Sequence, residues 1–212
     1  MENPVLIFGA RQIGRAAKEI FDTNGVVVYG FLDDDTSLHQ HELDEAVVLG
    51  STDDDGYLKL IGKKCEAFVA LDDTRLKKRM VGMLNEVRKM QPVNAIHAKS
   101  TISARAEIGH GNLISAGVVV GPGAKIGSHS ILHPQVTIGV DAQVGSYVQV
   151  GAGAQINAGA VVGEEAFIGS GVIVVAGVTI GKGARVGAGA VVVAPVKEGE
   201  TVFGNPAQVV KA

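Results

Sequence analysis

Large aliphatic residues return at a fixed six-residue interval through the second half of the chain. Every sixth residue from Ile96 to Val192 is isoleucine, leucine or valine, which gives 17 consecutive matches without a slip. The residue two positions before each is small or valine in most repeats, and the residue after each is usually glycine. Three hexapeptides can close a triangular coil with the large aliphatic inside, and stacked coils pair their backbones as parallel strands. The pattern therefore predicts an all-β domain over 93–212, a left-handed parallel β-helix.

Valines next to this aliphatic column indicate that the prism packs against other copies of itself. We expect these valines on the prism faces, exposed in one chain and partly covered by partner subunits. Trimers are the usual assembly of such prisms, so the sequence predicts a homotrimer. The valines expected on the faces are Val118, Val119, Val136, Val148, Val172 and Val178.

Short apolar runs alternate with helical patterns in the first half of the chain. Asn24 and Gly25 end the first helical pattern, as a left-handed cap does. Asp73 or Thr74 can cap the start of the second. Strands that alternate with helices predict a parallel α/β sheet, here a Rossmann-like domain over 1–92. The expected strands are 5–8, 26–32, 46–49 and 67–71, and the expected helices are 11–21 and 74 to about 90.

Composition agrees with this division and excludes several classes of protein. Residues 1–92 hold 16 of the 22 acidic residues, whereas 93–212 hold 21 of the 29 glycines. A net charge of −3 leaves no basic footprint for nucleic acid. A lone Cys65 excludes a disulfide framework and a CxxC redox site. No apolar stretch is long enough to span a membrane and no basic leader precedes the first apolar run, so we expect a soluble cytoplasmic protein.

The order of these pieces resembles one bacterial family of sugar acetyltransferases with hexapeptide repeats. That family includes sialic acid O-acetyltransferases and N-acetyltransferases of UDP-4-amino-sugars. The resemblance runs from the motifs at 7–10 and 31–34, through the hexapeptides, to Gly187-Ala188-Gly189 and the run 203–207 (Phe-Gly-Asn-Pro-Ala). It implies transfer of an acetyl group from acetyl-CoA to an amine or hydroxyl of a sugar or nucleotide-sugar by a homotrimer. The nucleotide-sugar would then lie between the first domain and the prism, and acetyl-CoA between two prisms.

A glycine loop and an acidic run are the candidates for binding the nucleotide-sugar. The loop matches neither a Rossmann fingerprint nor a P-loop, but amides at a helix start can hold a phosphate, and Arg11 or Arg15 could add positive charge. The acidic run follows the second strand, where a carboxylate can accept a hydrogen bond from a ribose or a uracil N–H. The family usually has glycine and histidine where Gln12 and Ile13 stand. The alternatives are a structural turn and a solvated acidic loop. The predicted binding residues are Gly9, Arg11, Gln12, Ile13, Gly14, Asp33 and Asp34.

The sequence departs most from the family at the position of the general base. A histidine suits proton removal from the attacking group, and the resemblance aligns that histidine with Val140. A second register aligns it with Glu164, and Glu164–Glu165 could act as a carboxylate base if burial raised a pKa. His133, one corner earlier, could serve as the base, with Asp141 or Gln149 orienting the acceptor. The alternative for His133 is a surface histidine in a turn.

Residues one coil apart stack along the prism, and this suggests contacts for acetyl-CoA. Ala158 and Ala176 follow Val140 in one such column and leave room for a pantetheine arm. Lys182 and Arg185 could contact phosphates, or could be solubilising charges only. Gln149 completes the predicted acetyl-CoA set.

Histidines are also candidate zinc ligands, since some left-handed prisms bind zinc. A catalytic zinc site needs three ligands that converge on one point, and no third histidine follows at a suitable spacing. We therefore predict no metal. The rival to an acetyltransferase is an inactive relative that binds a nucleotide-sugar or serves as a trimeric scaffold. The histidines considered were His97, His110, His129 and His133.

Overall fold

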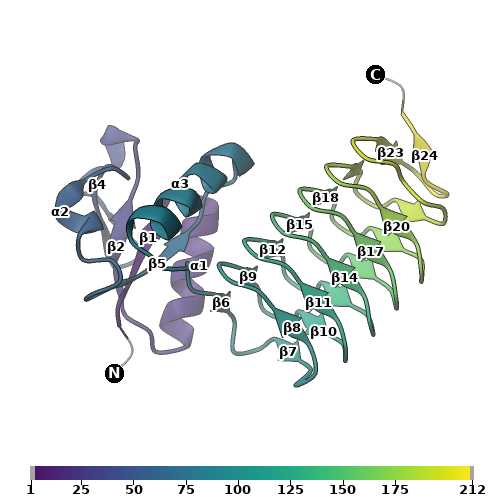
Figure 1. Ribbon diagram of the computed structural model, residues 1–212, viewed down its shortest axis with the longest axis horizontal. Helices are drawn as coiled ribbons and strands as arrows, with labels where there is room; N and C mark the ends of the chain where they lie inside the picture. Colours follow the sequence, from purple (N-terminus) through teal and green to yellow (C-terminus); the bar gives the residue numbers. More distant parts are fainter. Residues whose placement is uncertain (1–2, 211–212) are drawn as a thin grey trace. The chain divides into compact units, whose positions relative to one another are not determined.

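The computed structural model describes residues 3–210, and the chain divides into two compact units between Ala98 and Lys99 (Figure 1). The first unit is an α/β domain with a five-stranded sheet in the order β3-β4-β2-β1-β5. Its elements are β1 (Val5–Phe8), α1 (Gln12–Thr23), β2 (Val28–Leu32), η1 (Thr36–Leu38), β3 (Glu42–Leu43), β4 (Ala46–Gly50), α2 (Asp55–Leu58), β5 (Glu66–Val69), α3 (Thr74–Val87) and β6 (Ala95–Ile96).

The sheet of the first unit is buried on both faces because its central strands are continuous apolar runs. All four residues of β1 are buried. On one face Phe8 packs with Val81 and Leu84 of α3. On the other face Phe21 of α1 meets Phe68 of β5 edge to face, with ring centroids 5.8 Å apart. Helices therefore cover both faces, as the alternating pattern predicts.

A hairpin makes this sheet mixed, whereas the sequence predicts a parallel one. Strand β3 pairs antiparallel with β4, so the expectation of an all-parallel sheet is wrong at its edge. Asp44 and Glu45 form the two-residue turn and both have positive φ, 49° and 67°. Such turns usually carry Asn-Gly or Asp-Gly. The pair Asp-Glu gives no such signal, which is why the hairpin is not predicted.

The second unit is a parallel β-helix built from the hexapeptides. Its three sheets run β22-β19-β16-β13-β10-β7, β20-β17-β14-β11-β8 and, in the third, β24-β23-β21-β18-β15-β12-β9. Among the described residues, no helix is long and apolar enough to cross a membrane. The strands are β7 (Thr101–Ile102), β8 (Glu107–Ile108), β9 (Leu113–Ile114), β10 (Val119–Val120), β11 (Lys125–Ile126), β12 (Ile131–Leu132), β13 (Thr137–Ile138), β14 (Gln143–Val144), β15 (Gln149–Val150), β16 (Gln155–Ile156), β17 (Val161–Val162), β18 (Phe167–Ile168), β19 (Ile173–Val174), β20 (Thr179–Ile180), β21 (Arg185–Val186), β22 (Val191–Val192), β23 (Thr201–Phe203) and β24 (Gln208–Val209).

Most valines expected on the prism faces lie inside the prism, so that expectation is wrong for all but one of them. Val119 alone is exposed, at 43%. Side chains two apart on an extended strand point to the same side, so a valine two positions before the large aliphatic joins it in the interior. Val119 lies between two such positions and points outward. The buried valines are Val118, Val136, Val148, Val172 and Val178.

The glycine after each large aliphatic allows neighbouring coils to approach closely. A Cβ added to Gly139 would lie 2.6 Å from the amide nitrogen of Ala158 in the next coil. A Cβ added to Gly163 would lie equally close to the amide nitrogen of Lys182, at 2.6 Å. These glycines are therefore required for stacking, and not for an unusual backbone angle.

Some turns of the prism carry side chains at the left-handed position where other coils have glycine. His129 and Tyr147 have φ of 62° and 59°, and their rings stack with centroids 4.9 Å apart. Residues with a Cβ adopt this conformation at a cost of about 1–2 kcal/mol. The ring contact offsets part of that cost.

Replacing Val118 by alanine should lower the free energy of unfolding by about 2 kcal/mol, because it empties a site in the prism interior. Replacing the adjacent Val119 by alanine should change it by no more than about 0.5 kcal/mol, because that side chain points outward. Urea denaturation at one fixed protein concentration measures both. Equal losses for the two variants would contradict the assignment of inward and outward positions.

Candidate functional site

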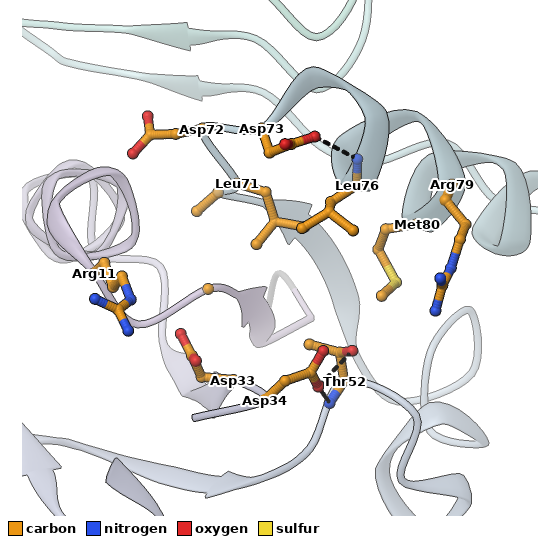
Figure 2. Close-up of a pocket in the computed structure, with 12 residues that line it drawn as sticks. Arg11, Asp33, Asp34, Thr52, Leu71, Asp72, Asp73, Leu76, Arg79 and Met80 are labelled. Atoms are coloured by element: carbon orange, nitrogen blue, oxygen red, sulfur yellow. Dashed lines mark hydrogen bonds between the residues drawn. The ribbon is translucent and has the colours of Figure 1, made fainter. Parts of the chain in front are cut away.

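A cavity of about 280 Å³ opens in the first unit at the carboxyl ends of β1, β2 and β5 (Figure 2). This edge of a parallel sheet is where open α/β domains bind their ligands. The lining combines four carboxylates and two guanidinium groups with an apolar wall. The lining residues are Gly9, Arg11, Asp33, Asp34, Thr52, Ala70, Leu71, Asp72, Asp73, Leu76, Arg79 and Met80.

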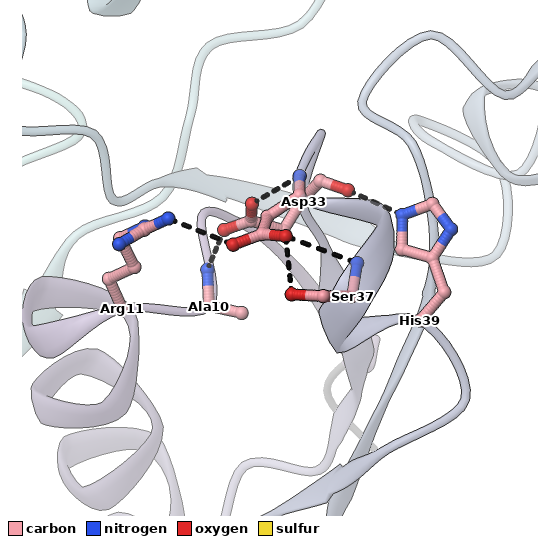
Figure 3. A network of polar contacts seen from close by, with 6 residues as sticks. Ala10, Arg11, Asp33, Ser37 and His39 are labelled. Atoms are coloured by element: carbon pink, nitrogen blue, oxygen red, sulfur yellow. Dashed lines mark hydrogen bonds and ion pairs between the residues drawn. The ribbon is translucent and has the colours of Figure 1, made fainter.

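Asp33 holds the floor of this cavity together. Its Oδ2 accepts a hydrogen bond from the Ala10 amide at 2.8 Å, and its Oδ1 accepts one from the Asp35 amide at 2.9 Å (Figure 3). The ring of His39 contacts the Asp33 carbonyl at 2.7 Å. Asp33 is only 9% exposed. It lines the cavity, but both carboxylate oxygens already have protein partners: Oδ2 joins the loop after β2 to the loop after β1, and Oδ1 closes a turn within its own loop.

Asp34 differs from Asp33 because one of its oxygens faces the cavity without a protein partner. Its Oδ1 accepts hydrogen bonds from the Thr52 amide at 2.9 Å and the Thr52 hydroxyl at 2.8 Å. Its Oδ2 makes no hydrogen bond to any residue that the structure describes. Thr52 thus fixes the carboxylate while leaving one acceptor for a ligand N–H or O–H.

Only part of the predicted glycine loop lines the cavity. Gly9 does so at φ 103°, and a Cβ there would lie 2.7 Å from the Ala70 carbonyl oxygen, so this position requires glycine. Gly14 lies beneath Gly9 and lets α1 pack against the loop. Ile13 is buried in the core, and Gln12 lines a separate groove on α1. Gln12, Ile13 and Gly14 are therefore outside the cavity.

Arg11 and Arg15 have different partners. Arg11 lines the cavity and pairs with Asp35 at 3.0 Å. Arg15 lines the groove on α1 and donates two hydrogen bonds to the Asp44 carboxylate, at 2.6 and 2.9 Å. Of the two, only Arg11 can act on a ligand in the cavity.

Several cavity residues follow β4 and β5 and are not among the predicted binding residues. Thr52 comes two residues after β4, and the run 70–73 follows β5 directly. The rule that ligands bind at carboxyl ends of parallel strands could have found both segments. Leu76, Arg79 and Met80 come from α3, and no sequence signal marks them. Figure 2 shows Arg11 on one side of the cavity and Arg79 on the other, with the apolar side chains between them.

On the prism, His133 and Gln149 lie together. His133 follows β12, Gln149 lies in β15, and their Nε2 atoms are 3.1 Å apart. Arg185 lies two coils beyond Gln149 on the same sheet, with its guanidinium 4.8 Å from the centre of the Phe167 ring. These residues share one face of the prism.

The other predicted prism residues lie at different turns. Val140, 48% exposed, and Asp141, at φ 55°, form the turn after β13, and Ala158 and Ala176 follow in the same column. Lys182 lies at a third turn, where its Nζ is 3.8 Å from Glu164 and 3.7 Å from Glu165. One chain therefore does not gather the predicted catalytic and acetyl-CoA residues into one site. Within the described residues, no cluster of three metal-ligating side chains occurs.

Comparisons with known proteins agree with this architecture. The family model for the bacterial transferase hexapeptide (six repeats) matches residues 105–140 and 159–194. A histidine-to-asparagine variant of perosamine N-acetyltransferase from Caulobacter crescentus, solved with CoA and GDP-perosamine, is 28% identical over 100% of this chain and 99% of that chain, with a TM-score of 0.90. The chain carries bacterial transferase hexapeptide repeats and is similar over its whole length to a hexapeptide-repeat sugar N-acetyltransferase.

Two further solved structures are similar to the chain over almost its whole length. The acetyltransferase domain of PglB from Neisseria gonorrhoeae, solved with acetyl coenzyme A, is 26% identical over 99% of this chain and 100% of that chain, with a TM-score of 0.88. WeeI from Acinetobacter baumannii is 27% identical over 98% of this chain and 99% of that chain, with a TM-score of 0.81. No curated protein matches the chain.

Replacing Asp33 by alanine should lower the free energy of unfolding by about 2–4 kcal/mol, because it leaves the amides of Ala10 and Asp35 without their acceptor. Asp72 lines the same cavity but is exposed and acts on Lys77 only by its charge, so its replacement by alanine should cost no more than about 1 kcal/mol. Urea denaturation of the two variants compares them. A loss for Asp33→Ala no larger than for Asp72→Ala would refute the structural role of Asp33.

Proposed function

We propose that this protein is an acetyl-CoA-dependent N-acetyltransferase of an amino sugar carried on a nucleoside diphosphate. The observation that carries the proposal is its similarity over the whole chain, in both units, to an N-acetyltransferase solved with CoA and GDP-perosamine. Fold alone would not suffice, because a fold hosts many activities.

The cavity of the first unit supports the nucleotide half of this proposal. The free Oδ2 of Asp34 can accept a hydrogen bond from a base or ribose, and Leu71, Leu76 and Met80 offer an apolar wall to a flat base. Arg11 supplies positive charge beside the start of α1, where a phosphate is favoured. The acceptor on Asp34 and the apolar wall suit a nucleoside better than a free sugar, and Arg11 is the lining residue placed for attached phosphates.

The outer surface of the prism supports the acyl-donor half. Val140, Val175 and Val193 are 48%, 37% and 54% exposed, and Ala158 and Ala176 are also exposed. A parallel β-helix with a stripe of exposed valine and alanine suits a surface that a second copy and an apolar pantetheine arm would cover. We propose a homotrimer whose subunits cover this stripe and bind acetyl-CoA there.

The reaction would be a direct attack of the sugar amine on the thioester carbonyl. The amine nitrogen forms a bond to the acetyl carbon, its proton passes to a base, and the CoA thiolate leaves with the electron pair and takes up a proton. Backbone amides would stabilise the oxyanion that forms in between. Lys182 and Arg185 would contact the phosphates of CoA.

His133 is our choice for the base, with Gln149 as its positioning residue. An amide N–H donated by Gln149 to Nε2 places the imidazole proton on Nδ1. With the amide turned over, its carbonyl accepts from Nε2–H and leaves Nδ1 as the proton acceptor. Asp141 would act on the acceptor sugar from the neighbouring turn.

Purified protein should release CoA from acetyl-CoA when supplied with a UDP-4-amino-sugar or GDP-perosamine, and the sugar product should be one acetyl group heavier. Thiol release and mass spectrometry measure the two products. A protein that binds both ligands and forms neither product would be an inactive relative, and the proposal would fail.

Replacing His133 by alanine should lower the turnover rate by at least about 100-fold, because general base catalysis contributes that much. The matched control is His110→Ala, which removes an exposed histidine from another turn of the same prism and should leave the rate unchanged. Equal rates for wild type and His133→Ala would exclude His133 as the base.

A further inference from the structure

The Arg11 side chain spans the loops after β1 and β2 at the edge of the cavity. Its Nη2 donates to Asp35 Oδ2 at 3.0 Å, and the two side chains are 72% and 34% exposed (Figure 3). Arg11 is also the residue before α1, whose first turn has no side-chain cap. A negatively charged group in the cavity near the start of α1 would therefore compete with Asp35 for the Arg11 guanidinium.

Asp35 does not depend on Arg11 for its own charge or position. Its Oδ1 accepts hydrogen bonds from the Ser37 amide at 3.1 Å and the Ser37 hydroxyl at 2.6 Å, and this holds the start of η1. These two bonds are the main reason that the pKa of Asp35 lies below its usual value, and Arg11 contributes less. Asp35 remains an anchored carboxylate after Arg11 leaves.

We infer that the diphosphate of the ligand breaks the Arg11–Asp35 ion pair. We call this ion pair the latch, closed when it is formed and open when it is broken. The guanidinium exchanges the Asp35 carboxylate for phosphate oxygens, while Asp35 stays bound to Ser37. An exposed ion pair such as Arg11–Asp35 changes the equilibrium between its paired and separated forms by less than about fivefold. Hydrogen bonds from a guanidinium to phosphate are charge-assisted and frequently bidentate. They raise the binding constant of the ligand by roughly tenfold or more. The exchange therefore favours the ligand.

The latch selects ligands by their phosphates and not by their base. A nucleoside fills the base and ribose positions near Asp34 but offers nothing to Arg11, so it leaves the latch closed. A nucleoside diphosphate opens it and gains the guanidinium contact. This inference rests on the proposed nucleotide site and adds to it the exchange by which Arg11 leaves Asp35 for the phosphates.

Isothermal titration of the full-length protein with UDP and GDP, each beside its own nucleoside, tests the latch. Arg11→Gln should weaken binding of the diphosphate about tenfold and leave the nucleoside unchanged. Asp35→Asn keeps the cap on Ser37 but removes the charge, so it should strengthen binding of the diphosphate about two- to fivefold. In the Arg11→Gln background, Asp35→Asn should have no effect.

A second ion pair on the same helix supplies matched controls. Arg15 and Asp44 carry the same charges but line the groove on α1, so Arg15→Gln and Asp44→Asn should change diphosphate affinity by less than twofold. An Asp35→Asn gain that persists without Arg11 would mean simple repulsion between Asp35 and phosphate, and would overturn the latch. Unchanged diphosphate affinity in Arg11→Gln would overturn it as well.

The same titrations separate this inference from the proposed function. If neither UDP nor GDP binds the wild-type protein, the nucleotide site fails and the latch fails with it. If the diphosphate binds and the variants behave like their controls, the latch alone is wrong. Acetyl transfer is measured independently and does not enter the comparison.

Discussion

The register between coils is the constraint on which the second unit depends. Each strand pairs with the strand one coil later, as Val119 does with Thr137, and this parallel pairing repeats along all three faces. It follows that residues one coil apart share a column and that outward side chains at different thirds of a coil point in different directions. The separation of His133 from Val140 is a direct consequence.

The first unit depends on a smaller interaction, the two hydrogen bonds that Asp33 accepts. One joins the loop after β2 to the loop after β1, and the other closes a turn within the second loop. Because Asp33 carries out this structural task, the neighbouring Asp34 provides the acceptor for a ligand. Three successive acidic residues therefore have three roles: Asp33 joins loops, Asp34 faces the cavity, and Asp35 caps a short helix.

Periodic features could be predicted from the sequence and non-periodic ones could not. Seventeen repeats predict the β-helix because each repeat places a large aliphatic residue at the same inward position. Residue type alone places Val136 and its equivalents on the outside, whereas their spacing from Ile138 places them inside, where the structure has them. The β3–β4 hairpin and the cavity residue Arg79 carry no repeat, motif or turn signal, and only tertiary packing determines where they lie.

The columns of outward side chains also limit how the prism can change in length. Loss of a single hexapeptide would move every later side chain to a different face, although a glycine such as Gly139 would still meet the backbone of the next coil, because the glycines on all three faces make the same contact. Loss or gain of whole coils leaves every column intact. Insertions and deletions in this half of the gene are therefore tolerated only in complete coils, which makes prism length a property that evolves in steps.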